Sequence, residues 1–177
     1  MIALLISDTH GHLDLVEAAG RRALEAGARL ALHLGDDLED AEPLRRLGLE
    51  VRGVQGVYHP DYQRPGLPNR LLLRLERVPV LLTHSRLPHA NDRPEDGDPA
   101  EVARRLGAWA VLYGHTHEPA IREEAGLLWI NPGHLKPEDK KGWPPTLALL
   151  EASGASLSVR IEELLGGRPL LRWPDKP

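Results

Sequence analysis

Short apolar runs alternate with segments of helical periodicity in the first third of the chain, and together they predict a parallel β-sheet with crossover helices. Residues 2–6 and 30–34 are apolar runs that end in polar loops, as buried strands do. Between them, over 13–27, apolar residues recur at helical spacing, with acidic residues near the start and glycine at the end. A short helix over 40–47 and a third strand over 49–54 follow. This order of elements is typical of parallel strands joined by helices.

The rest of the chain is predicted to consist mainly of strands. The expected elements are a hairpin over 71–75 and 78–83, a polar loop over 86–98, a helix over 99–106, a strand over 109–113 and mostly antiparallel strands over 119–163. Asp98 precedes the helix and suits its N-cap, because its carboxylate can accept hydrogen bonds from the first free amides. The polar loop is long enough to serve as a lid or a binding element.

The composition is that of a soluble globular chain. The 177 residues are 41% hydrophobic and 27% charged, which is enough apolar material for a sizeable core. We find no repeat or linker, so we expect one domain over 1–165 and a loosely held C-terminal tail over 166–177. No apolar run reaches the roughly 18 residues of a bilayer-spanning helix, and the short apolar N-terminus lacks the basic flank of a signal peptide. We therefore expect a cytoplasmic protein without a membrane partner.

Charge and cysteine content exclude several classes of function. The net charge of −4 argues against general nucleic-acid binding, which needs a basic face. The chain contains no cysteine, which excludes disulfides, thiol catalysis and zinc–cysteine sites. Any metal ion must therefore be held by histidine, aspartate, glutamate or asparagine.

Metal-type side chains gather in the loops after predicted strands. Four short motifs carry them: Asp8-Thr-His10, Gly35-Asp36, Thr83-His84 and Gly114-His115-Thr-His117. Because loops after the carboxyl ends of parallel strands converge at one edge of a sheet, we expect these six side chains to meet there. Imidazoles and carboxylates without thiolates suit Zn²⁺, Mn²⁺, Fe or Ni. Six ligands exceed what one tetrahedral ion needs, whereas two ions that share one carboxylate would use them all.

In this order and spacing, the four motifs resemble those of the calcineurin-like metallophosphoesterase superfamily. The short chain, the SDTHG opening and the INPG segment after GHTH look most like its small bacterial and archaeal phosphodiesterase branch, which is also similar to the metal-poor retromer scaffold subunit. The resemblance runs from residue 2 to about residue 160. It implies an α/β fold, a four-layer α-β-β-α sandwich of two mixed sheets flanked by helices, with the metal site at the sheet edge.

The resemblance also implies a hydrolase with one or two divalent ions. Carried over residue by residue, Asp8, His10 and His117 would bind the first metal, His84 and His115 the second, and Asp36 would bridge both. Two ions about 3.5–4 Å apart can activate a bridging water for in-line attack on phosphorus and stabilise the phosphoryl oxygens. The implied substrate is a phosphate ester, a phosphodiester rather than a monoester, and no side chain acts as the nucleophile.

The sequence departs from the family pattern after the third predicted strand. The family has a GN-x-D or GNHD/E segment there, whose asparagine binds the second metal, whereas this chain reads VRGVQGVYH over 51–59. Alignment on Val-Arg-Gly places Val54 at the asparagine position, and alignment on Val-Gln-Gly places Val57 there. The strand length from Gly48 favours Val54. Valine cannot bind a metal, so the second ion is expected to bind more weakly.

Three further residues lie in candidate loops. Arg86 stands where the family has the second histidine of THGH, and its planar guanidinium could hold a phosphate with two parallel hydrogen bonds. A solvated loop arginine is the alternative. His59 is a candidate late ligand or general acid, with a histidine of a proline-rich loop as the alternative. His89 lies on the long polar loop, where it could approach a substrate, and it is not selected as a site residue.

Two other functions stay open beside the dinuclear phosphodiesterase. One is a binding scaffold with weakened catalysis, which the missing asparagine favours. The other is a mononuclear enzyme with metal only at Asp8, His10, Asp36 and His117. The presence of all six other ligands favours an enzyme, since a chain losing its activity would more often lose a histidine or aspartate as well. A homo-oligomer is compatible with each of these functions.

Overall fold

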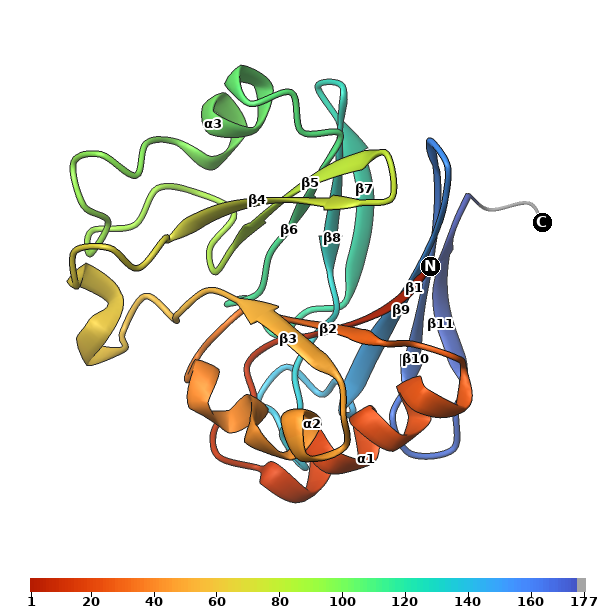
Figure 1. Cartoon of the computed structure of the whole chain (residues 1–177). Helices are drawn as coiled ribbons and strands as arrows, with labels where there is room; N and C mark the ends of the chain where they lie inside the picture. Colours follow the sequence, from red (N-terminus) through yellow and green to blue (C-terminus); the bar gives the residue numbers. More distant parts are fainter. Residues whose placement is uncertain (175–177) are drawn as a thin grey trace.

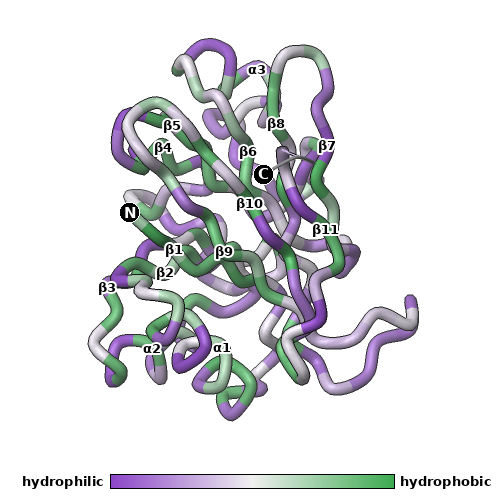
Figure 2. Tube along the Cα trace, turned by 90° about the vertical axis from the view of Figure 1, so that its right-hand side faces the viewer, coloured by the Kyte–Doolittle hydropathy of each residue, from purple (hydrophilic) through white to green (hydrophobic). Residues whose placement is uncertain are grey.

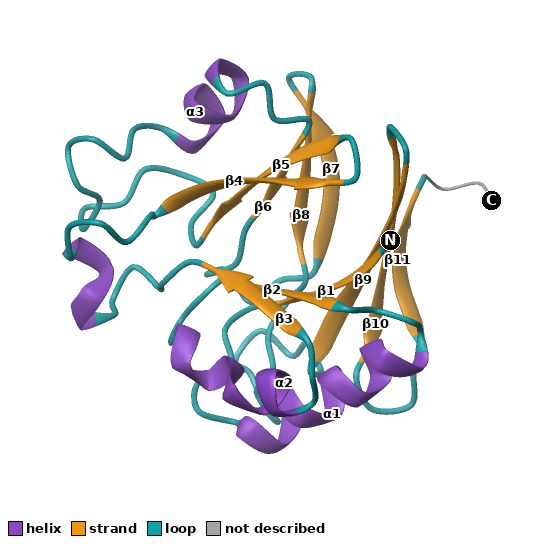
Figure 3. Ribbon diagram, viewed as in Figure 1, coloured by secondary structure: helices purple, strands orange, loops and turns teal. Residues whose placement is uncertain are grey.

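Two β-sheets pack face to face, and helices cover the outer face of each sheet (Figures 1 and 3). The computed structural model describes residues 1–174. The first sheet has the order β11-β10-β9-β1-β2-β3. Its strands are β1 (Ile2–Ile6), β2 (Leu30–His33), β3 (Glu50–Gly53), β9 (Thr146–Ser153), β10 (Ser156–Glu163) and β11 (Pro169–Trp173). The three N-terminal strands are parallel, as predicted, while β9 runs antiparallel to β1.

The second sheet has the order β4-β5-β6-β8-β7. Its strands are β4 (Arg70–Leu75), β5 (Val78–Thr83), β6 (Ala110–Leu112), β7 (Ala120–Glu124) and β8 (Leu127–Asn131). The predicted β4–β5 hairpin is confirmed. In the region expected to be mostly antiparallel, β8 instead pairs parallel with β6. Both sheets are therefore mixed, as the resemblance implies.

The helices lie on the two outer faces. On the first sheet lie α1 (Leu13–Glu25), the short 3-10 turn η1 (Leu38–Ala41) and α2 (Glu42–Arg46), and α3 (Pro99–Arg105) lies against the second sheet. A further 3-10 turn, η2 (Pro60–Gln63), lies in the loop before β4. Asp98 caps α3, since its carboxylate accepts hydrogen bonds from the amides of Ala100 at 2.8 Å and Glu101 at 3.1 Å. The four-layer α-β-β-α sandwich is confirmed.

Apolar side chains form three clusters: one between the two sheets and one between each sheet and its helices. Successive residues of a strand point to opposite faces of its sheet. In β1, Leu4 packs toward α1 with Val16, whereas Leu5 packs in the layer between the sheets with Leu82 of β5. A third cluster joins the second sheet to α3 through Val102. Figure 2 shows the hydrophobic residues concentrated along the strands and the hydrophilic ones in the connecting segments.

The C-terminal segment needs a correction. We expect a loosely held tail from residue 166, but Pro169–Trp173 forms β11, which pairs antiparallel with β10. The side chain of Trp173 packs on the core between the sheets, and its ring lies 5.4 Å from that of Trp109, centroid to centroid. The segment was misjudged because its prolines and arginines suggest a loop, while the residue that Trp173 packs on, Trp109, lies far away in the sequence. The end of the expected tail, residues 175–177, lies outside the described residues.

No helix in the part of the chain that the structure describes combines the length and the hydrophobicity that crossing a bilayer requires.

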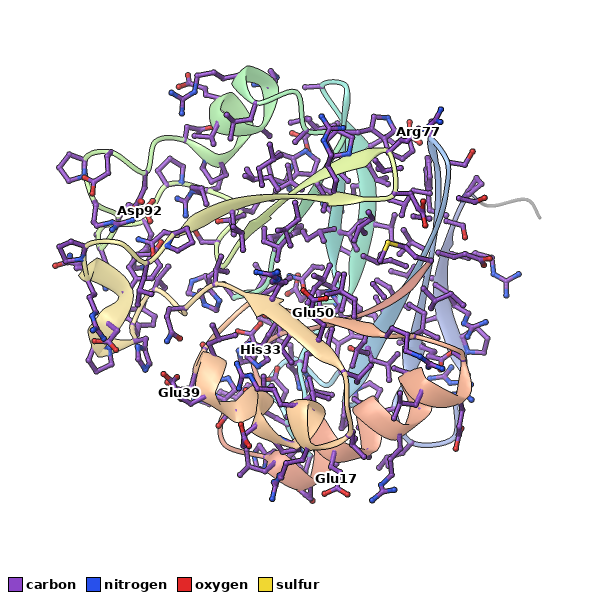
Figure 4. The ribbon with its side chains drawn as sticks, in the orientation of Figure 1. Glu17, His33, Glu39, Glu50, Arg77 and Asp92 are labelled. Carbon is purple, nitrogen blue, oxygen red and sulfur yellow. The ribbon has the colours of Figure 1, made fainter. Side chains whose placement is uncertain are left out.

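A buried hydrogen-bonded chain connects the end of β2 to the loop after β1. His33 is fully buried, and its Nδ1 accepts a hydrogen bond from the amide of Gly35 at 3.2 Å (Figure 4). The neutral ring therefore carries its proton on Nε2, which lies 3.4 Å from Thr9 Oγ1. Thr9 donates to Asp40 Oδ2 at 2.6 Å, and the same oxygen accepts from the amide of Gly11 at 2.8 Å. This chain helps to hold the Asp-Thr-His loop in place.

We expect His33 to make the protein less stable in acid. Burial lowers the pKa of His33 to about 4, whereas the ring has its ordinary pKa of 6.5 once the chain unfolds. Below pH 6.5 the unfolded state therefore binds a proton that the folded state does not. The free energy of unfolding should fall between pH 6.5 and pH 4, by about 3 kcal/mol from this ring. The variant His33→Gln lacks this titration, so its stability in urea, measured in EDTA, should fall less. Parallel curves for the two proteins would contradict this expectation.

Candidate metal centre

The six predicted side chains come together where the loops after β1, β2, β5 and β6 meet. Two groups have ligand atoms that all lie within 4.8 Å of one another: Asp8, His10 and His117 form one, and Asp8, Asp36 and His84 the other. His115 lies beside them, with its ring centroid 5.2 Å from that of His84. Four segments far apart in the sequence thus build one cluster, which we call the metal cluster (Asp8, His10, Asp36, His84, His115 and His117).

Asp8 belongs to both groups, and Asp36, a member of the second, also approaches the first. Asp36 Oδ2 is 3.0 Å from His10 Nε2, and its Oδ1 is 3.6 Å from His84 Nε2. On the other side, His10 Nε2 and His117 Nε2 are 3.1 Å apart, and His117 Nε2 is 3.4 Å from Asp8 Oδ1. Carboxylate oxygens and imidazole nitrogens therefore point at common centres from several sides. This geometry suits a carboxylate that serves two ions at once.

The backbone of the cluster is strained at four of its six residues. Asp8, His10, His115 and His117 have positive φ angles of 52°, 47°, 68° and 61°, a region that residues other than glycine seldom occupy. Hydrogen bonds hold this conformation: the amide of Asp8 donates to Gly35 O at 2.7 Å, and the amide of His115 donates to Asp8 Oδ2 at 2.9 Å. Such strain is typical of functional sites, where the surroundings fix side chains in one direction.

Outer contacts decide which nitrogen of two histidines faces the cluster. His84 Nδ1 lies 2.6 Å from Leu34 O, so it donates to that carbonyl and leaves a lone pair on Nε2. His117 Nδ1 lies 2.7 Å from Asp139 Oδ2, which fixes its Nε2 in the same way. Metal-binding histidines commonly have such a partner on the other ring nitrogen. Among the described residues, the buried His84 Nε2 and Asp8 Oδ1 have no hydrogen-bond partner, as expected of atoms that receive a cation.

The charges of the cluster also fit a cation. Burial and the negative charge of Asp8 raise the pKa of Asp36. The adjacent Asp8 carboxylate, with a further contribution from Asp139, raises the pKa of His117 to about 9 although burial opposes it. Burial and the neighbouring imidazole of His84 lower the pKa of His115, which favours a neutral ring. Two carboxylates in one partly buried site thus draw positive charge, which a divalent ion would supply.

Sequence reasoning did not identify Asp139, which lies in the loop between β8 and β9. Besides His117, its carboxylate contacts the amide of Lys141 at 3.0 Å and Lys136 Nζ at 3.4 Å. The side chain is 5% exposed, so it is held in one position. Its only sequence signal is the general rule that metal-binding histidines have an acidic partner, and that rule does not say which acidic residue is meant.

The structure favours Val57 over the preferred Val54 as the residue at the position of the missing asparagine. Val54 lies in the core between the sheets, and its amide extends the pairing of β3 by donating to His33 O at 3.0 Å. By contrast, Gly56 contacts Asp36 directly: its amide donates to Asp36 O at 2.7 Å, and a Cβ there would lie 2.7 Å from Asp36 Cα. This contact favours the register in which Val57, the next residue, stands at the position of the asparagine. The strand length could not show this, because β3 ends at Gly53 and the chain contacts Asp36 only at Gly56.

We expect Val57→Asn to strengthen binding of a second divalent ion, on the order of tenfold, because an amide oxygen would face the cluster beside Asp36. Manganese titration by calorimetry measures this. Val54→Asn is the matched control: it buries an amide in the core, so it should lower the free energy of unfolding by roughly 2–4 kcal/mol and leave manganese affinity unchanged. If Val54→Asn bound manganese more strongly instead, Val54 would be the residue at the asparagine position.

Arg86 does not join the metal cluster in the structure. Its guanidinium forms an ion pair with Glu124 of β7 and lies over the ring of Trp129, 4.9 Å from the centroid. Both partners belong to the second sheet. To hold a phosphate, Arg86 would have to leave these contacts, and the structure instead gives it a role in packing.

His59 belongs to a separate acidic group. Its Nδ1 accepts a hydrogen bond from the amide of Asp61 at 3.1 Å, so the neutral ring carries its proton on Nε2. That nitrogen lies 3.3 Å from Asp37 Oδ1 and 3.7 Å from Glu39 Oε2. A protonated Nε2 donates to carboxylates and has no lone pair for a metal. His59 thus lies with Asp37 and Glu39 in a third group whose candidate ligand atoms are within 4.8 Å of one another, apart from the metal cluster.

Comparison with known proteins agrees with the geometry. The family model of the calcineurin-like phosphoesterase superfamily domain matches residues 1–155. A probable metallophosphoesterase of Methanothermobacter thermautotrophicus is 29% identical over 178 residues, covering 97% of this chain and 96% of the relative.

Solved structures share the fold at lower identity. YfcE, a phosphoesterase from E. coli, matches with a TM-score of 0.71 and 21% identity, over 97% of this chain and 98% of YfcE. An archaeal phosphodiesterase matches with a TM-score of 0.68 and 20% identity, over 91% of this chain and 99% of the other. Vps29 of Entamoeba histolytica, in complex with zinc, matches with a TM-score of 0.66 and 24% identity, over 97% and 98% of the two chains. On the match of its sequence to the family model, this chain belongs to the calcineurin-like phosphoesterase superfamily.

Proposed function

We propose that this protein is a metal-dependent phosphodiesterase whose active site is the metal cluster. The observation that carries the proposal is the convergence of two carboxylates and four imidazoles, with Nε2 of His84 and His117 left free to face them by hydrogen bonds at Nδ1. Family membership supports hydrolysis of a phosphate ester. The structural likeness to an archaeal phosphodiesterase supports a diester as the substrate.

In this proposal Asp8, His10 and His117 would hold one divalent ion, His84 and His115 would hold the second, and Asp36 would serve both. Bound ions of this kind lower the pKa of water and stabilise negative charge on phosphoryl oxygens. The contribution of the chain is to keep its ligands in position before substrate arrives. Leu34 and Asp139 orient the two imidazoles, and the strained loop at Asp8 is held by Gly35.

A binding scaffold is the second candidate, and a specific observation favours it. Val57 takes the place of the asparagine that binds the second metal in the family, which weakens that site. Vps29 shows that the same fold, with zinc bound, occurs in a protein named for vacuolar sorting. A third candidate is a mononuclear enzyme, with metal at Asp8, His10, Asp36 and His117 only.

Hydrolysis of bis-p-nitrophenyl phosphate by metal-stripped protein, titrated with Mn²⁺, tests the proposal. We expect activity to rise with Mn²⁺ and to fall by at least ~10³-fold in His117→Ala, which loses the tighter ion and its activated water. His12→Ala is the control, since this neighbouring histidine makes no side-chain capping hydrogen bond to α1 and lies outside the metal cluster. Metal binding without hydrolysis at any Mn²⁺ concentration would favour the scaffold instead.

The shape of the titration separates one ion from two, since a two-ion centre gives a second rise at higher Mn²⁺. Manganese as the physiological metal, among Mn, Zn, Fe and Ni, stays a prediction. A cytoplasmic location and a homo-oligomer also stay predictions, which cell fractionation and light scattering would test.

A further inference from the structure

We propose that Tyr58 and His89 form an aromatic wall beside the metal cluster that binds the nucleobase of a nucleotide-like phosphate ester. The inference deepens the proposed function and rests on it, because it takes the phosphate of the substrate to lie at the metal cluster. It assigns a substrate class and two binding residues that lie outside the six expected ligands.

The rings of the wall continue outward from the buried ligands. His84 is fully buried, and its ring lies 5.2 Å from that of His115, centroid to centroid. The ring of His115 lies 5.8 Å from that of His89 and 6.0 Å from that of Tyr58. Tyr58 and His89 meet edge to face at 5.2 Å with an interplanar angle of 90°. A series of rings thus runs from the buried cluster to the surface.

The side chain of Tyr58 is largely exposed to solvent although its ring lies beside the metal cluster. It is 73% exposed, whereas the other two tyrosines, Tyr62 and Tyr113, are buried. A planar ring of a ligand that stacks on Tyr58 would remove this apolar surface from water. Because every base has a flat π-face, such stacking is favourable and tolerates different bases.

The second residue of the wall presents a hydrogen-bond donor. His89 Nδ1 accepts from the amide of Asn91 at 3.1 Å, so the neutral ring carries its proton on Nε2. A base offers ring nitrogens and carbonyl oxygens that accept such a bond. The wall therefore combines a stacking face with a polar group, which suits a nucleobase better than an alkyl chain.

Hydrogen bonds hold the wall in place. Asn91 Nδ2 donates to Val57 O at 2.8 Å, which joins the loop of His89 to that of Tyr58. Asp92, labelled in Figure 4, accepts from the amide of His89 at 2.8 Å and is paired with the buried Arg70 at 2.7 Å. A wall fixed before binding loses little conformational entropy when a ligand stacks on it. The predicted role of residues 86–98 as a binding element is consistent with this arrangement.

Two ligands that differ only in the base test the inference. Calorimetry of manganese-loaded protein should give a Kd for adenosine 5′-monophosphate that is about tenfold lower than that for ribose 5-phosphate. In Tyr58→Ala, the Kd for adenosine 5′-monophosphate should rise to that of ribose 5-phosphate, which should itself stay unchanged. Tyr58→Phe should keep the preference, because the ring and not the hydroxyl group makes the contact.

Trp109→Leu is the matched control, because Trp109 is an exposed aromatic residue that packs on Trp173, and it should change neither Kd. Equal Kd values for the two ligands in the unaltered protein would overturn the inference. So would an equal loss of both ligands in Tyr58→Ala, or the absence of binding by both. The proposed function fails differently: no diester is hydrolysed at any Mn²⁺ concentration, while the preference for the base persists.

Discussion

Replacing Asp36 by asparagine is expected to lower the rate of phosphodiester hydrolysis by at least ~10³-fold. The two oxygens of this carboxylate face His10 and His84, at 3.0 Å and 3.6 Å. In the proposed centre Asp36 is the carboxylate that would serve both ions. Asparagine keeps the shape of the side chain but removes the negative charge and one of the two oxygen ligands. Both ions should therefore bind more weakly, because the side chain that would fix the distance between them has lost one of its oxygens.

The neighbouring carboxylate provides a close control. Asp37→Asn makes the same chemical change one residue along the chain, at a side chain that is 49% exposed and faces His59 rather than the metal cluster. Steady-state hydrolysis and manganese stoichiometry should be normal in Asp37→Asn and strongly reduced in Asp36→Asn. Equal activity in the two variants would show that Asp36 does not serve the ions, and the assignment of the centre would have to be abandoned.

Removing the carboxylate of Asp139 is expected to weaken manganese binding about 10–100-fold. Asp139 accepts from His117 Nδ1 at 2.7 Å, which holds the ring and leaves Nε2 free for the metal. In Asp139→Ala the ring can rotate or carry its proton on the other nitrogen. Asp139→Asn keeps an acceptor without the charge, so its affinity should lie between those of Asp139→Ala and the unaltered protein.

A second measurement distinguishes this positioning role from a general loss of structure. The carboxylate of Asp139 contributes to the raised pKa of His117, so the pKa of that ring, followed by NMR without metal, should fall below about 9 in Asp139→Ala. Glu138→Ala, at the adjacent exposed residue, should change neither the manganese affinity nor this pKa. If Asp139→Ala bound manganese as tightly as the unaltered protein, the contact with His117 would have no function in metal binding.

The elements that local pattern can specify were predicted closely. The spacing of apolar residues along 13–27 corresponds to α1, and the polar residue before the helix at 99 is its N-cap, because both features depend on neighbours within a few positions. The parallel order of β1, β2 and β3 was also predicted, since short crossover helices permit few other arrangements. From this order came the expectation that Asp8, Asp36 and their partners meet.

Where the sequence failed, the deciding contact joins distant segments. Trp173 of β11 packs on Trp109 although the composition of its segment suggests a loop, and Arg86 pairs with Glu124 although its motif position suggests a phosphate. In both places an interaction made after folding overrides the local preference. Neither partner can be identified by counting residues along the chain.

The sequence by itself determined the family, through it the layer architecture, and the kinds of atom available to a metal, because motif order and side-chain chemistry can be read along the chain. The tertiary structure alone decided which atoms face the metal cluster. It placed Asp139 behind His117, Gly56 against Asp36 with Val57 next to it, and Tyr58 beside His89. Each of these contacts depends on the relative position of two loops, and that position is set by how the sheets pack rather than by either loop.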